Sequence, residues 1–255
     1  MMYGQLVLGS PGSGKTSFCF AMKQIIHSTE DFPFFINLDP GNKISLSDFD
    51  INIQELVNSD EIIPELNIGP NGSLLYSIEY FEKYSDWFER KFTCFLNNMR
   101  CYHFLFDFPG QIELFTHHLS VRNFIKKILS INIKLVGLTL TDSFFFKDKS
   151  SRNSLLLVCI IIMLNIELPH IHLLSKSDLF LTRNTKQNSK ELSNNKYTKL
   201  TTIYHNSPFL WSKKLTYDFI ILINDFSSLN SLPVSIFYPR SLKMIYKKIK
   251  NMIIS

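Results

Sequence analysis

The segment from Gly9 to Thr16 reads GSPGSGKT and matches the phosphate-binding pattern G-x-x-x-x-G-K-[ST] at every fixed position. Before it, the apolar run Tyr3–Leu8 predicts a short buried strand, and after it Ser17–Ile26 predicts the start of a helix. A strand that passes through a glycine-rich turn directly into a helix is the context in which this pattern binds nucleotide phosphates. The motif therefore constrains the chain to an α/β fold with an anion site after its first strand.

The chemistry of this loop follows from its residue types. Glycines lack Cβ atoms, so the backbone can fold around an anion and direct its amide hydrogens at the α- and β-phosphates of a nucleotide. Lys15 can reach the β- and γ-phosphate oxygens, and the Thr16 hydroxyl can bind Mg²⁺. A chance glycine-rich turn is the alternative, and the strand and helix on either side count against it.

Strand-like and helix-like segments alternate along most of the chain, which has 255 residues and is 45% hydrophobic. The expected strands, apolar runs typical of a parallel sheet, are Phe34–Leu38, Tyr102–Phe106, Ile133–Leu140, Ile171–Leu174 and Val234–Phe237. The expected helices are Leu74–Met99, Glu113–Leu129, Ser151–Asn165 and Arg240–Ile253. This pattern predicts one domain over residues 1–255, a doubly wound, mostly parallel sheet with helices on both faces, and a polar surface insertion near 184–200.

Composition counts against several classes of protein. Much of the net charge of +5 comes from Lys186–Lys199 and Lys243–Lys250, whose surroundings favour a solvated face over a nucleic-acid patch. The four cysteines form no C-x-x-C pair, which favours a reducing, cytoplasmic setting. Because the first strand-like run begins at Tyr3, we expect no cleaved signal peptide. The apolar run Leu155–Leu164 is shorter than the roughly 20 residues that cross a membrane, so we expect no membrane contact.

A second acidic motif, DFPGQ, begins at Asp107 directly after the strand-like run Tyr102–Phe106. A carboxylate at this place can hold Mg²⁺ through water, as it does in other proteins that carry the phosphate-binding loop. Gly110 can bring its amide close to a γ-phosphate, and Gln111 and Glu113 can orient an attacking water. A simple turn is the alternative, since Asp, Pro and Gly all favour turns.

The segment Ser175–Asp178 (SKSD) follows the apolar run HIHLL and is similar to the guanine-recognition pattern [NT]-K-x-D. The carboxylate of Asp178 can accept hydrogen bonds from N1–H and the exocyclic amine of guanine. Adenine lacks that pair of donors and would leave the carboxylate unpaired, at a cost of about 1–3 kcal/mol. The Lys176 stem can cover the face of the base. Ser175 stands where Asn or Thr is usual, and a capped loop is the alternative.

Two further segments are ambiguous from their residues alone. Asp39 in NLDPGN can contact Mg²⁺ or water, and a turn at Asp-Pro-Gly-Asn explains it equally well. Gly69, Pro70 and Asn71 predict only a turn with a polar tip.

Taken in order, GSPGSGKT, NLDPGN, GPNGSLLYSIEYFE, DFPGQIELFTHH and ELPHIHLLSKSDL resemble the GPN-loop GTPase family over about residues 3–180. GPNGSLLY, DFPGQIELFTHH and LPHIHLLSKSDL are most similar to its second eukaryotic paralogue. The resemblance implies a dimeric GTPase that cycles between GDP and GTP, with a GPN-loop insertion near residues 60–80. In such a dimer Asn71 would contact the partner's γ-phosphate region.

The resemblance also implies a set of site residues. The phosphates would be held by Gly12, Ser13, Gly14, Lys15, Thr16 and Ser17. Magnesium would be held by Thr16, Asp39 and Asp107, and guanine by Lys176 and Asp178. Gln111 and Glu113 would position the water, and with Asp39, Asp107 and Asn71 they complete the expected catalytic set.

The implied partners are a second copy of the chain or a paralogous GPN-loop GTPase, and RNA polymerase II subunits or assembly factors. A factor of this kind would work in the cytoplasm, with shuttling to the nucleus as an option. Two other functions remain open. One is an ATP-dependent P-loop kinase, whose lid would need arginines where this chain has only Arg183. The other is a nucleotide-binding assembly scaffold with little turnover.

Overall fold

The computed structural model describes residues 2–29, 31–96, 102–147, 149–179 and 231–254, together with residues 218 and 221. The strands in these ranges are β1 (Tyr3–Gly9), β2 (Phe32–Asn37), β3 (Ile51–Asn52), β4 (Tyr102–Asp107), β5 (Lys134–Asp142), β6 (His170–Ser175) and β7 (Leu232–Pro233). The α-helices are α1 (Lys15–His27), α2 (Ser59–Leu66), α3 (Pro70–Lys83), α4 (Ser85–Leu96), α5 (Glu113–Thr116), α6 (Leu119–Ser130), α7 (Lys149–Ile166) and α11 (Pro239–Ile254). The 3-10 turns are η1 (Leu46–Asp48), η2 (Ile53–Glu55) and η3 (Ser143–Lys147). The polar insertion expected near 184–200 lies outside the described residues.

The strands of the described residues form one seven-stranded parallel sheet in the order β3-β2-β4-β1-β5-β6-β7. β1 lies inside the sheet, paired with β4 on one side and with β5 on the other. The chain first moves outward from β1 to β2 and β3, returns to β4, and then crosses to β5 on the far side of β1. In sheets of this kind the ligand crevice lies at the carboxyl ends of the strands where the order reverses, here around β1.

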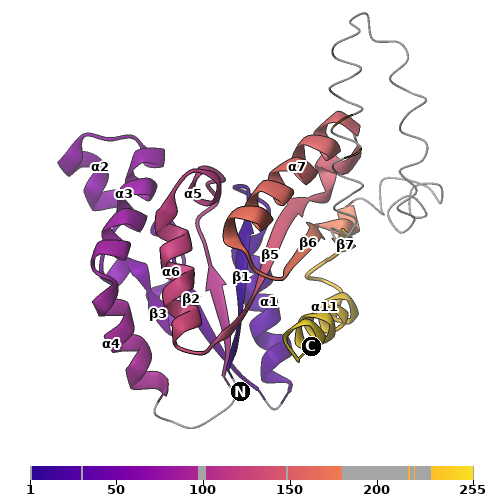
Figure 1. Ribbon diagram of the computed structural model, residues 1–255, viewed down its shortest axis with the longest axis horizontal. Helices are drawn as coiled ribbons and strands as arrows, with labels where there is room; N and C mark the ends of the chain where they lie inside the picture. Colours follow the sequence, from indigo (N-terminus) through magenta and orange to yellow (C-terminus); the bar gives the residue numbers. More distant parts are fainter. Residues whose placement is uncertain are drawn as a thin grey trace, which may run out of the picture.

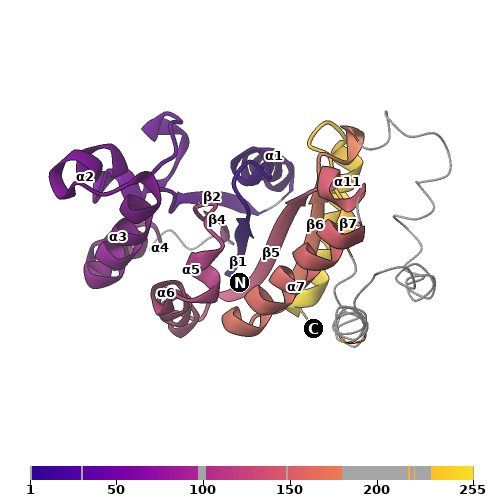
Figure 2. The same cartoon turned by 90° about the horizontal axis from the view of Figure 1, so that it is seen from above.

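Helices cover both faces of the sheet (Figures 1 and 2). On one face α1 and α11 pack over a cluster that includes Phe18, Val7 and Ile245. On the other, the core below α3, α4, α6 and α7 is rich in aromatic rings, such as the edge-to-face pair of Phe81 and Phe124 at 5.0 Å. All seven residues of β1 are buried, as expected of a strand covered on both faces. The predicted doubly wound α/β fold is confirmed.

Two predicted helices have other boundaries in the structure. The helix expected over Leu74–Met99 begins four residues earlier, at Pro70, because proline suits the first helical position, where no amide hydrogen bond is lost. It is then interrupted at Tyr84, whose φ of −105° and ψ of 32° lie outside the helical region, so that α3 and α4 are separate. The helix expected over Glu113–Leu129 is divided in the same way after Thr116 into α5 and α6.

The last strand also differs from its prediction over Val234–Phe237. The amide of Val234 does pair with the Leu174 carbonyl oxygen at 2.8 Å, but β7 itself is Leu232–Pro233. Beyond Val234 the chain turns, because the amides of Phe237 and Tyr238 bond back to Ser235. The short strand β3 and the helix α2 were not anticipated from the sequence. Within the described ranges, no helix combines the length and apolar character needed to span a bilayer.

Candidate functional site

The predicted phosphate loop connects β1 to α1 at the carboxyl edge of the sheet. Gly12 and Gly14 have φ angles of 71° and 86°, in the left-handed region that glycine adopts without steric cost. Gly14 is also the N-cap of α1 and supplies no side-chain cap, so the first amides of the helix remain available to a ligand. The backbone and the positive end of α1 therefore form a cup for an anion.

A cavity of about 470 Å³ opens over this loop. It is lined by Pro11, Gly12, Gly14, Lys15, Thr16, Ser17, Asp39, Gly41, Asn71, Leu74, Gly110 and Gln111. The lining thus combines the phosphate loop with the segments that follow β2 and β4 and with the start of α3. Its size is within the range of sites that hold nucleotide-sized ligands.

Lys15 is buried at the floor of this cavity, where its Nζ donates to the Ser10 carbonyl oxygen at 3.2 Å. Burial lowers the pKa of Lys15, against the charges of Asp107 and Asp39, which act to raise it. Gly110 closes over the lysine so tightly that a Cβ at this position would lie 2.9 Å from Lys15 Nζ and 2.9 Å from Pro11 Cα. Glycine is required here because its backbone must pass this close to the loop.

Thr16 and Asp107 meet below the cup. The Thr16 hydroxyl donates to Asp107 Oδ2 at 2.6 Å, whereas Asp107 Oδ1 is buried without a hydrogen-bond partner. Burial raises the pKa of Asp107 to about 7, although the Thr16 hydrogen bond and the Lys15 charge act to lower it. A buried carboxylate oxygen with no partner is an unfavourable arrangement that a cation would relieve.

Asp39 lies on the other wall of the cavity, after β2, and its Oδ1 accepts a hydrogen bond from the Gly41 amide at 3.0 Å. Burial raises its pKa as well. In the described part of the chain, no group of three or more His, Cys, Asp or Glu is arranged to bind a metal. Mg²⁺ usually takes one or two carboxylates and completes its shell with water and substrate phosphates. Thr16, Asp39 and Asp107 fit that kind of site.

Asn71 and Gln111 also reach this cavity. Asn71 lies not on a turn, as its neighbours suggested, but in the first turn of α3, whose N-cap is Gly69. Gln111 is only 8% exposed, and its Nε2 donates to Asn71 Oδ1 at 2.9 Å. Glu113, by contrast, is exposed at the start of α5 and is not part of the cavity lining. The structure therefore brings Gln111 to the site but leaves Glu113 outside it.

A second cavity, of about 250 Å³, adjoins the first and shares Gly14 and Ser17 with it. It is lined by Ser13, Gly14, Ser17, Phe18, Leu140, Ser175, Lys176, Asp178, Leu179, Val234, Ile236 and Phe237. Most of this lining is apolar, and Asp178 supplies a carboxylate at its wall. A flat, partly apolar ring with hydrogen-bond donors on one edge suits such a cavity.

Lys176 lines the second cavity and bonds to the phosphate loop that lines the first. Its φ of 55° is unusual for a residue with a side chain, and its Nζ donates to the Gly12 carbonyl oxygen at 2.9 Å and to Asp142 Oδ2 at 2.8 Å. Ser175, which stands where Asn or Thr is usual, donates to the Thr141 carbonyl oxygen at 3.1 Å. The loop after β6 is thus fixed to the phosphate loop and to the end of β5.

The sequence analysis did not identify several residues of this site, among them Asp142, Ile236 and Phe237. Asp142 ends β5 just as Asp107 ends β4, and that position at the carboxyl edge of a strand is a signal that could have identified it. Ile236 and Phe237 were assigned to a strand, and nothing in their local pattern indicates that they line a cavity.

A phosphate cup between β1 and α1, acidic residues after two neighbouring strands and an adjoining apolar cavity define a P-loop nucleotide-binding protein. A family model described as "Conserved hypothetical ATP binding protein" matches residues 7–254. Relatives include the GPN-loop GTPase 2 homolog of Dictyostelium discoideum, 35% identical over 249 residues, which are 94% of this chain and 76% of the relative. The chain belongs to the GPN-loop GTPase family, and the expectation from the motifs is confirmed.

Two other comparisons define how far the likeness extends. The GPN-loop GTPase QQT1 of Arabidopsis thaliana is 41% identical over 180 residues, which cover 70% of this chain but 59% of that protein. The crystal structure of a GTPase in apo form from Pyrococcus abyssi superposes with a TM-score of 0.80, covering 99% of this chain and 98% of its own. At 20% sequence identity, that structure supports the fold alone.

Proposed function

We propose that this chain binds GTP and GDP together with Mg²⁺ and hydrolyses GTP to GDP and phosphate. One observation carries the proposal: an amide-lined phosphate cavity adjoins an apolar cavity that ends in a carboxylate, and the two share Gly14 and Ser17. A nucleotide whose phosphates lie over Gly12 to Ser17 would place its base beside Asp178. The names of the relatives agree with this use of the site.

The choice of purine depends on Asp178. Guanine presents two donors that the Asp178 carboxylate can accept, whereas adenine presents no such pair of donors at the wall of this largely apolar cavity. The Lys176 stem borders the same cavity and can cover one face of the ring. The family description mentions ATP, so the base preference is the point that an experiment must test first.

Hydrolysis would rely mainly on positioning and on neutralising charge around the phosphates. Lys15 and the loop amides would stabilise negative charge on the β- and γ-phosphate oxygens. Gln111 lines this cavity, and its Oε1 is buried without a partner while Nε2 donates to Asn71; to accept a hydrogen bond from the attacking water, Oε1 would have to turn toward the cavity. Mg²⁺, held by Thr16, Asp39 and Asp107, would supply further positive charge.

The test is calorimetric titration of the purified chain with GDP and with a non-hydrolysable GTP analogue, each in the presence of Mg²⁺. We expect binding to both, weak competition by ATP, and release of phosphate from GTP over multiple turnovers. Equal competition by ATP would favour an ATP-dependent kinase. Binding without phosphate release in a single-turnover assay would favour a scaffold.

We further propose that two GPN-loop GTPase chains, identical or paralogous, face each other across their Asn71 segments. Asn71 is exposed at the rim of the phosphate cavity, where a second chain could reach it. By the same family resemblance, RNA polymerase II subunits or assembly factors would be its clients, in the cytoplasm and on the way to the nucleus. Sedimentation with and without GTP tests the dimer, and co-purification with polymerase subunits tests the client.

A further inference from the structure

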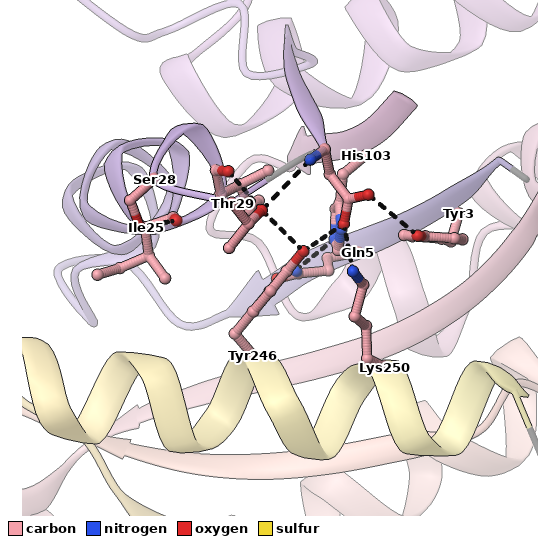
Figure 3. A network of polar contacts seen from close by, with 10 residues as sticks. Tyr3, Gln5, Ile25, Ser28, Thr29, His103, Tyr246 and Lys250 are labelled. Carbon is pink, nitrogen blue, oxygen red and sulfur yellow. Dashed lines mark hydrogen bonds and ion pairs between the residues drawn. The ribbon is translucent and has the colours of Figure 1, made fainter. Parts of the chain in front are cut away.

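A buried carboxylate lies at the edge of the sheet opposite to the nucleotide cavities. Asp31 follows α1 and is 7% exposed. It accepts a hydrogen bond from the Tyr3 hydroxyl on β1 at 3.3 Å and from the Tyr246 hydroxyl on α11, and it pairs with Lys250 Nζ at 2.7 Å. Figure 3 shows Tyr246 and Lys250 extending from α11 toward β1. We call Tyr3, Asp31, Tyr246 and Lys250 the Asp31 cluster.

Lys250 is therefore not part of the solvated face that the charge pattern of Lys243–Lys250 suggested. Its ammonium group lies over the rings of Tyr3 and Tyr246, 5.9 and 5.4 Å from their centroids. Burial acts to raise the pKa of Asp31, but the hydrogen bonds from Lys250 and Tyr246 outweigh it and lower that pKa. The carboxylate is thus kept charged by groups that α11 supplies.

The cluster lies at the far ends of α1 and α11. At their other ends, α1 lines both nucleotide cavities, and α11 begins just after a turn that lines the second one. α1 starts at Lys15 in the phosphate loop and ends at His27, four residues before Asp31. α11 starts two residues after Phe237. Phe237 lines the second, largely apolar cavity beside Asp178, which we call the base cavity. Figures 1 and 2 both show the two helices side by side on the same face of the sheet.

The turn that carries Phe237 is fixed to the start of α11. The amide of Phe237 donates to Ser235 Oγ at 3.3 Å, and the Ser241 hydroxyl donates to the Ser235 carbonyl oxygen at 3.1 Å. Val234, at the other end of the turn, donates to Leu174 on β6 and accepts from the Ser177 amide just after β6. A shift of α11 along its axis would therefore move Ile236 and Phe237 relative to the base cavity.

Beside the cluster, the Thr29 hydroxyl just after α1 lies 3.4 Å from the Tyr246 hydroxyl, and the other described contacts between α1 and α11 are apolar, through residues such as Met22, Ile26 and Ile249. Apolar contacts have little directional preference, so they do not by themselves fix how far one helix slides along another. Buried charged hydrogen bonds do have that preference, and setting a register is a role for which such groups are well attested. The cluster supplies the charged directional contacts between α11 and the end of α1, while Lys134 Nζ on β5 donates to the Ile253 carbonyl oxygen at the end of α11.

We propose that Asp31, Tyr246 and Lys250 are positioning residues for the base cavity: they fix the register of α11 on α1 and so hold Ile236 and Phe237 at its wall. This inference rests on the guanine-nucleotide site proposed above. It assigns a role in nucleotide affinity to residues at the opposite edge of the sheet. The hydrolysis step itself takes place in the phosphate cavity and is not assigned to these residues.

The test variant is Lys250→Met, which keeps the length of the side chain and removes its charge. We expect the Kd for GDP to rise about three- to thirtyfold, with kcat at saturating GTP within about twofold of wild type. Lys250→Arg should restore the wild-type Kd, because it keeps the pair with Asp31. Lys247→Met is the matched control, since Lys247 is exposed on the same helix. Tyr246→Phe is a milder variant should Lys250→Met fold poorly.

Hydrogen exchange without nucleotide gives a separate readout. In Lys250→Met the amides of residues 234–241 should exchange faster than in wild type, and in Lys247→Met they should not. Unchanged exchange and unchanged Kd in folded Lys250→Met would overturn the proposal, and so would faster exchange spread evenly over the whole of α1 and α11. If wild type itself bound no guanine nucleotide, the proposed function would be wrong. The exchange data would still show whether Lys250 fixes the register of α11 on α1.

Discussion

Gln111 donates from Nε2 to Oδ1 of Asn71 over 2.9 Å and so joins the segment after β4 to the first turn of α3. The Asn71 carbonyl oxygen lies on the same side, 3.4 Å from Nε2, and can only accept. That contact fixes which end of the Gln111 amide faces Asn71. The acceptor end, Oε1, is left buried and unpaired beside the phosphate cavity.

Replacing Asn71 by alanine should therefore slow turnover without weakening GDP binding. The Gln111 amide would lose its partner, and misplacement of a water-orienting group by about 1 Å can cost a hundredfold, so we expect kcat to fall about ten- to a hundredfold. Turnover at saturating GTP and calorimetry with GDP are the two measurements. Unaltered turnover would rule out a catalytic role for Asn71.

A mixing experiment distinguishes whether Asn71 acts in the active site of its own chain or in that of a partner chain. If Asn71 acts across a dimer, equal amounts of Asn71→Ala and Lys15→Ala proteins should together recover roughly a quarter of wild-type activity, because half of the dimers are mixed and each holds one complete site. If Asn71 serves only its own chain through Gln111, the mixture should stay as inactive as its components. Each variant alone is the control.

Asp178→Asn should change which purine is preferred. An amide donates as well as accepts, so the variant should lose about 1–3 kcal/mol of GDP affinity and gain affinity for xanthosine diphosphate, whose base has a carbonyl in place of the guanine amine. Competitive binding of the two diphosphates to wild type and variant gives both numbers. A variant with the wild-type order of preference would show that Asp178 does not contact the base.

Gly110→Ala should impair the phosphate cavity through sterics alone. Its Cβ would lie 2.9 Å from the Pro11 backbone and from Lys15 Nζ, closer than such atoms approach. An overpacking cost of about 1–3 kcal/mol should appear as a roughly five- to hundredfold weaker Kd for GTP. Gly72→Ala is the control, because there the new Cβ meets only the Ile68 side chain at 3.5 Å. Equal Kd values in the two variants would contradict the close approach.

Buried histidine should make stability depend on pH. His172 is fully buried between Thr141 Oγ1 and Ser231 Oγ, and burial lowers its pKa to about 3, from about 6.5 in an unfolded chain. Above pH 6.5 both states are neutral at this group and it has no effect. Below that value the unfolded chain takes up a proton that the folded chain excludes, so stability falls by about 1.4 kcal/mol per pH unit.

Urea denaturation at pH 6.5 and pH 5 measures this term. Wild type should lose about 2 kcal/mol more between the two pH values than His172→Asn does, because the variant lacks the titrating group. Asp107, whose raised pKa acts in the opposite direction, is present in both proteins and cancels in the comparison. Equal losses in the two proteins would show that His172 is protonated in the folded state.

The sequence by itself determined the phosphate loop, the parallel α/β class and most of the acidic residues at the strand ends. Each of these is encoded locally. GSPGSGKT occupies adjacent residues, and unbroken apolar runs reflect strands buried on both faces. Asp39 and Asp107 follow such runs directly, so their place at the carboxyl edge followed from the fold class.

Only the tertiary structure decided which distant residues meet. The contacts of Gln111 with Asn71, of Lys176 with Gly12 and of Lys250 with Asp31 each join residues at least 40 positions apart. Such contacts depend on the order of the strands and on how helices pack across them, and local periodicity carries no information about either. Local periodicity also could not predict that Glu113 lies outside the phosphate cavity or that Phe237 lines the base cavity. Both positions depend on where a helix begins and how the preceding turn folds back.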